Sequence, residues 1–89
     1  MKSIITVFGK DKSGITASVS QTLANSNVNI LDIQQTILQE YFTMIMIVDI
    51  SKCTKTFKDL REELNKTGTK VGVSVNIQRE DIFNSMQSI

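Results

Sequence analysis

The sequence predicts an α+β domain in which two helices cover one face of a four-stranded antiparallel sheet. The chain has 89 residues, which is enough for one compact domain and too few for two. Apolar side chains follow the period of a strand in four segments and the period of a helix in two others. The order of these segments is βαββαβ, which is the split βαβ motif of ferredoxin-like domains.

The first predicted strand covers residues 3–9, where β-branched and aromatic side chains dominate. The first predicted helix covers residues 14–26, because apolar residues recur there at intervals of four. Asp11 and Ser13 each offer a side-chain oxygen for its N-cap. We expect this helix to end at residues 25–27, since asparagine tolerates the left-handed conformation that closes many helices.

The middle of the sequence predicts a hairpin of two strands, at residues 28–38 and 41–50. Gln39 and Glu40 form the expected tight turn between them. The first of these strands alternates apolar and polar side chains, as a half-buried strand does. The second carries apolar residues on both faces, which is typical of a strand in the centre of a sheet.

The last third of the sequence predicts a helix, a strand and a short final helix. The helix is expected at residues 56–67, with Thr56 and the acid three positions later as a capping box and Gly68 as the stop. Clear alternation of valine and isoleucine with small or polar residues predicts a strand at 71–78. An amphipathic pattern at 80–87 predicts the short C-terminal helix.

Charge and composition limit the possible partners. Ten basic and nine acidic residues leave a net charge of +1, so no single-sign field is available to attract nucleic acid or an anionic membrane. Neither is expected as a partner. The longest apolar run, Met44–Val48, is far too short to span a bilayer. Without a secretory signal, and with Cys53 as the one cysteine, the chain is expected to be cytoplasmic.

The residue types argue against catalysis. Histidine is absent, which removes the commonest general base and the commonest metal ligand together. Acylphosphatases and metal chaperones share this order of elements, but the loop at residues 9–14 has neither the arginine of the former nor the paired cysteines of the latter. The strand at 41–50 lacks the basic, glycine-rich aromatic run of RNA-recognition domains. We expect no enzyme, no cofactor and no metal site.

One face of the predicted sheet is apolar although the helices lie on the other. Ile4, Phe8 and alternate residues of 41–50 point away from the helices. An apolar patch of that size rarely stays exposed in a monomer, so we expect this face to meet a partner surface.

Two stretches of the sequence resemble the signature of the ACT domain family. They are the run from Gly9 to Ile15 and, after the first helix, the run from Asn29 to Ile33. Residues 40–44, together with residues 76–78 and 82–83 of the tail, resemble one branch of that family, the free-standing bacterial ACT proteins of uncharacterised role. This branch is related to the ACT-containing repressor of the glycine cleavage system. The resemblance covers nearly the whole chain and implies a small module that binds amino acids and regulates other proteins.

The turn between the first strand and the first helix also suits a small acid on chemical grounds. A helix start presents unpaired backbone N–H groups that favour a carboxylate, and a glycine lets a ligand approach the backbone. In the family, the loop and helix start come from one subunit and the asparagine at the start of the second strand comes from the other. The resemblance therefore assigns to the ligand site Asp11, Ser13, Gly14, Ile15, Asn29 and Ile30.

Each of these residues also has a purely structural interpretation. Asp11 serves equally well as a helix cap, Gly14 as a point of close packing, and Asn29 as a partner for loop backbone groups. We expect a homodimer or higher homo-oligomer that binds an amino acid or a similar small acid at a subunit interface and modulates an unidentified protein target. The alternative is a dimerising interaction module that binds no small ligand.

Overall fold

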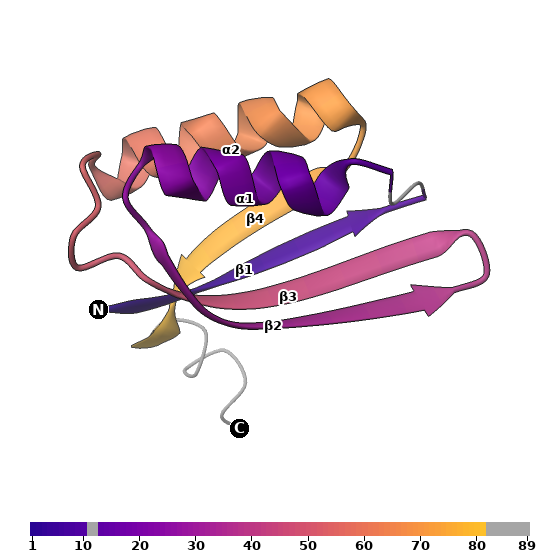
Figure 1. The fold of residues 1–89 in the computed structure, drawn as a ribbon, viewed down its shortest axis with the longest axis horizontal. Coiled ribbons are helices and arrows are strands. Elements are labelled where there is room, and N and C mark those ends of the chain that lie inside the picture. The colour runs from indigo at the N-terminus through magenta and orange to yellow at the C-terminus, as the bar shows by residue number, and fades with distance from the viewer. Residues whose placement is uncertain (11–12, 82–89) are drawn as a thin grey trace.

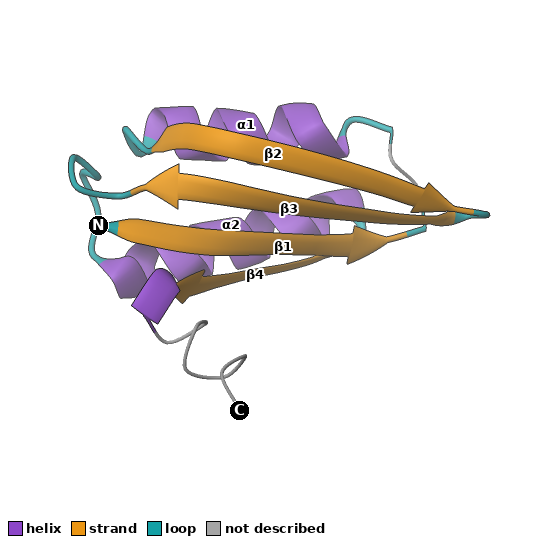
Figure 2. Ribbon diagram, turned by 90° about the horizontal axis from the view of Figure 1, so that it is seen from below, coloured by secondary structure: helices purple, strands orange, loops and turns teal. Residues whose placement is uncertain are grey.

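The computed structural model describes residues 1–10 and 13–81, and it has the predicted α+β architecture. Two helices lie side by side on one face of the sheet (Figure 1), and from the opposite face the strands are seen in front of them, with the helical residues 80–81 following the end of the last strand (Figure 2). The elements in chain order are β1 (Lys2–Gly9), α1 (Ile15–Asn25), β2 (Asn29–Leu38), β3 (Tyr41–Asp49), α2 (Phe57–Val71) and β4 (Ser74–Arg79).

The four strands form one antiparallel sheet in the order β2-β3-β1-β4. β3 is a central strand, as its two apolar faces predicted, and β2 lies at an edge. Gln39 adopts a φ of 55° in the hairpin turn and Asn27 a φ of 59° after α1. Both left-handed positions agree with the turns expected at these places.

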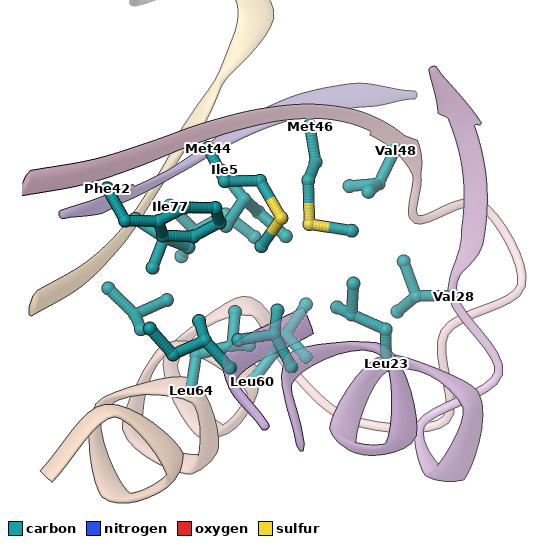
Figure 3. Packing of buried hydrophobic residues seen from close by; sticks show 14 residues of the cluster. Ile5, Leu23, Val28, Phe42, Met44, Met46, Val48, Leu60, Leu64 and Ile77 are labelled. Carbon is teal, nitrogen blue, oxygen red and sulfur yellow. The ribbon is translucent and has the colours of Figure 1, made fainter. Parts of the chain in front are cut away.

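The core fills the space between the helices and the sheet. Figure 3 shows Met44 and Met46 of β3 pointing towards Leu60 and Leu64 of α2, and all four side chains are fully buried. The alternation of β3 explains why: its even-numbered residues face the helices, and its odd-numbered residues face the other way. The same alternation in β1 buries Ile5 on the helix side.

The predicted boundary between the second helix and the last strand is wrong. Gly68 does not stop α2, which continues to Val71 and ends with Gly72 as a left-handed C-cap at a φ of 78°. Gly68 instead permits close packing, because a Cβ there would lie 2.7 Å from the backbone oxygen of Val73. The strand consequently begins at Ser74 rather than at Val71.

Both predicted helix caps are tested by the structure. The hydroxyl of Thr56 accepts a hydrogen bond of 3.1 Å from the backbone N–H of Asp59, as expected. At α1 the expectation is wrong, because Gly14 rather than Ser13 occupies the N-cap position. Asp11, the other cap predicted for this helix, lies outside the described residues. Of the C-terminal helix predicted at 80–87, the structure describes the first two residues as helical, and the rest lies outside the described chain.

Candidate functional site

The turn between β1 and α1 contains two glycines with different structural roles. Gly9 is buried, and a Cβ at this position would overlap Cγ1 of Val73. Gly14 has a φ of 74°, which favours glycine, and no atom of residues 1–10 and 13–81 beyond its chain neighbours lies within 4 Å of the place where its Cβ would be. Close packing is therefore not the reason for Gly14. Among the described residues, none beyond its chain neighbours fills the space beside the Gly14 Cα at the start of α1.

The start of α1 provides hydrogen-bond donors beside Gly14. The first helical bond runs from the N–H of Ser18 to the carbonyl oxygen of Gly14 at 3.0 Å. The N–H groups that precede Ser18 in the helix have no acceptor within the helix. The side chain of Ile15 is fully buried in the core, so only its backbone can contribute to a site here.

Asn29 lies at the other end of the sheet. It pairs with Asp49 at the end of β3, whereas Gly9 pairs with Phe42 near the beginning of the same strand. Most of the length of β3, roughly 20 Å, separates these two positions. Ile30 follows Asn29 and packs partly buried against the core. The structure thus brings Ser13, Gly14 and Ile15 together but places Asn29 and Ile30 far from them within one chain.

A hollow of about 300 Å³ lies at the Asn29 end of the sheet. It is lined by Asn27, Val28, Asn29, Asp49, Ser51 and Lys52. The side-chain amide of Asn27 donates a 2.9 Å hydrogen bond to the backbone oxygen of Lys52, which ties the loop after α1 to the loop after β3. The hollow therefore lies between two connected loops and carries side chains of both charges.

Sequence reasoning missed Asp49, Ser51 and Lys52. Oδ1 of Asp49 accepts hydrogen bonds from the backbone N–H of Ser51 at 2.9 Å and from the Ser51 hydroxyl at 2.5 Å. It also lies 3.3 Å from the α-ammonium group of Met1. The hydroxyl and N–H of Ser51, with the nearby ammonium, lower the pKa of Asp49 to about 2. The signal that was available is an aspartate two residues before a serine at a strand end, which is a common local turn.

The apolar outer face of the sheet is present as predicted. Phe8 and Tyr41 stack with ring centroids 5.8 Å apart, and Nζ of Lys10 lies 5.9 Å from the centroid of the Tyr41 ring. Phe8 is 53% exposed and Ile45 is 44% exposed. In the described part of the chain, this face has no cover.

Metal-ligand clusters and membrane-spanning helices are both absent from the part of the chain that the structure describes. Among residues 1–10 and 13–81, no three side chains of the types Asp, Glu, Cys or His gather as metal ligands would. No helix within the same residues has the length and apolar character needed to cross a membrane.

The sheet order, the two helices on one face and the glycine turn before α1 define a ferredoxin-like α+β domain. The family model described as "ACT domain" matches residues 3–78, and the chain belongs to this family. ACT domains are typically regulatory modules that bind small ligands. The expected family and fold are thereby confirmed.

Similar proteins support the same conclusion. A UPF0237 protein of Clostridium acetobutylicum is 57% identical over 89 residues, covering 100% of both chains. The solved structure of an ACT domain protein from Streptococcus pneumoniae is 51% identical, covers 93% of each chain and superposes with a TM-score of 0.83. A structure described as a putative glycine cleavage system transcriptional repressor shares the fold, with 22% identity and a TM-score of 0.75 over 88% of this chain and 44% of the other.

Proposed function

We propose that this protein is a regulatory module that binds an α-amino acid, or a similar small acid, between two copies of the chain. The observation that carries the proposal is the separation of Gly14 from Asn29. The two halves of the expected site lie at opposite ends of one sheet. A single small molecule cannot contact both in one chain, but it can do so where two chains lie antiparallel, side by side.

The exposed edge of β2 supplies a surface along which the two chains can associate. Ile33 and Ile37 lie on the helix side of the sheet opposite Met46 and Phe42, yet they are 39% and 53% exposed. The N–H of Ile33 donates to Oδ1 of its neighbour Asp32 at 2.8 Å, so it points away from β3. By the alternation of an antiparallel ladder, the N–H groups of Gln35 and Ile37 point outward too. Such an edge is a template for another strand.

Two copies of the chain can pair along this edge about a two-fold axis at Gln35, and the resulting register buries apolar side chains. It places Ile33 of each chain opposite Ile37 of the other, so both exposed side chains become buried. The pairing is antiparallel, so Asn29 of the partner subunit comes to the end of the sheet where β1 meets the glycine turn. The two halves of the ligand site then face each other across the interface.

In this arrangement the start of α1 receives the carboxylate of the ligand, because its first N–H groups have no acceptor within the helix and no described residue beyond the chain neighbours of Gly14 fills the space beside that glycine. Asn29 of the partner subunit offers both a donor and an acceptor. A ligand that contacts two subunits favours the assembly that it bridges. Regulation of a target protein follows if that target distinguishes the ligand-bound assembly from the ligand-free chain.

A thermal-shift screen of the standard amino acids and small carboxylic acids tests the proposal. A ligand present at a hundred times its Kd stabilises the fold by about 2.7 kcal/mol, which moves the melting temperature measurably. A melting temperature that no compound shifts would refute ligand sensing. It would favour the alternative, a ligand-free interaction module, for which the exposed side chains of Phe8 and Ile45 supply the surface.

A further inference from the structure

The hollow beside Asn29 carries an acid and a base on the same rim. Asp49 and Lys52 both line it, with Ser51 between them in the chain. Its volume of about 300 Å³ is at the lower end of the range for small-molecule sites. A small zwitterion is the class of ligand that matches a hollow of this size with opposite charges.

Asp49 already binds an α-ammonium group in this structure. The α-ammonium of Met1 lies 3.3 Å from Oδ1 of Asp49 and 2.7 Å from Oγ of Ser51. This contact demonstrates that the carboxylate and the hydroxyl together accept the group that every free α-amino acid carries. Within residues 1–10 and 13–81, the hydrogen bonds to the Asp49 carboxylate all end on Oδ1. Oδ2 remains for a second ammonium group.

Lys52 supplies the opposite charge. The hydrogen bond from Asn27 to its backbone oxygen holds its main chain in place. In the described part of the chain the ion pairs are those of Met1 with Asp49 and of Arg79 with Asp81, so the Lys52 ammonium is in neither. A lysine on the rim of a hollow binds a carboxylate as a point charge without needing a fixed geometry.

We infer that this hollow is the second half of the amino-acid site, in which Asp49 and Ser51 bind the α-ammonium of the ligand. Lys52 binds one oxygen of the α-carboxylate, whose other oxygen the start of α1 of the second subunit receives. The inference rests on the proposed function, since it assigns residues to the Asn29 side of the same site. It also defines the ligand class more sharply, because both the amine and the carboxylate must be free and charged.

Calorimetric titration of the full chain with the standard L-amino acids tests the assignment. Any amino acid that binds is then compared with its N-acetyl and its carboxamide derivative. We expect each derivative to bind about tenfold or more weakly, as loss of a charge-assisted hydrogen bond implies. Equal binding of the free and blocked forms would overturn the inference.

Three variants test which side chains bind the ligand. Asp49→Asn and Lys52→Gln should each weaken binding about tenfold or more, and Asp49→Asn should bind the free and N-acetylated forms almost equally. Lys66→Gln, on an exposed position of α2, is the matched control. If Asp49→Asn does not fold, Lys52→Gln still decides, because the Lys52 side chain makes no ion pair within the described residues.

The failures of the two proposals are distinguishable. If Asn29→Ala loses the ligand while Asp49→Asn and Lys52→Gln bind normally, the shared site stands and the hollow is excluded. If the wild-type chain binds neither an amino acid nor a small carboxylic acid, the proposed function fails, and the assignment of Asp49 and Lys52 fails with it. If it binds only acids that lack an α-ammonium group, that assignment alone fails.

Discussion

The side-chain amide of Gln35 lies 3.4 Å from the hydroxyl of Thr16, so the first turn of α1 reaches over the middle of the edge strand β2. This contact links the two features on which the proposed site depends. The N–H groups at the start of α1 that have no acceptor within the helix lie close to the edge along which a second chain can pair. A ligand at this helix start is therefore within reach of a strand added to β2.

Gln35→Pro should abolish dimerisation without unfolding the domain. The N–H of Gln35 points away from β3, so proline removes a donor that the sheet itself does not use, and proline is tolerated at such edge positions. Gln35→Ala keeps the N–H and removes the contact with Thr16, so it is the control. Light scattering should find Gln35→Ala dimeric and Gln35→Pro monomeric. A dimeric Gln35→Pro would mean that the copies associate elsewhere.

Gly14→Ala should destabilise the domain by about 1–2 kcal/mol, because an L-residue is strained in the left-handed conformation. No atom of residues 1–10 and 13–81 beyond the chain neighbours lies within 4 Å of the place that the new Cβ would occupy, so these residues add no steric overlap. Gly14→Asn should cost less, since asparagine tolerates this conformation. Urea unfolding of the three proteins measures the difference. Equal losses for alanine and asparagine would point to overlap rather than backbone strain.

Asp49 should make stability depend on pH in the acid range. Its pKa is lowered from 3.8 to about 2 in the folded chain, so the folded state favours the ionised form. The contribution is present above pH 4 and is lost as the pH falls towards 2. Melting temperatures of the wild type and Asp49→Asn should therefore converge over this interval. A difference in melting temperature between the two proteins that stays constant with pH would show that the charge of Asp49 does not contribute to stability.

Leu64→Ala should destabilise the domain by about 2–5 kcal/mol, because the side chain is fully buried and its removal leaves a cavity. Lys66→Ala, two residues along on the exposed side of α2, should change stability by less than about 0.5 kcal/mol. Chemical denaturation of both variants gives the comparison. Similar losses of unfolding free energy in the two variants would contradict the packing of α2 on β3.

Local patterns were sufficient to predict most of the fold. The alternation of β3 predicted a central strand, and the hydroxyl of Thr56 predicted the N-terminus of α2, because both depend on residues within four positions of one another. The same reasoning failed at Gly68, where a helix stop was expected. A glycine is needed at position 68 because Val73 and the start of β4 pack closely against it. The sequence pattern within α2 does not show this contact.

The candidate site depends more on the tertiary structure. The glycine turn was recognisable in the sequence, since Gly14 stands at the junction of a strand pattern and a helix pattern. That Asn29 lies at the far end of the sheet, opposite Asp49, follows from the antiparallel register of β2 and β3. The hollow formed with Lys52 follows from the same register and from the bond that Asn27 makes across the two loops.

Sequence periodicity thus determined which elements form and which faces they bury, because each of those choices is made between near neighbours in the chain. Only the tertiary structure decided which residues share a site. Residues far apart in sequence, such as Asn29 and Asp49, meet through strand register, and residues as close as Gly14 and Asn29 are held apart by the length of a strand.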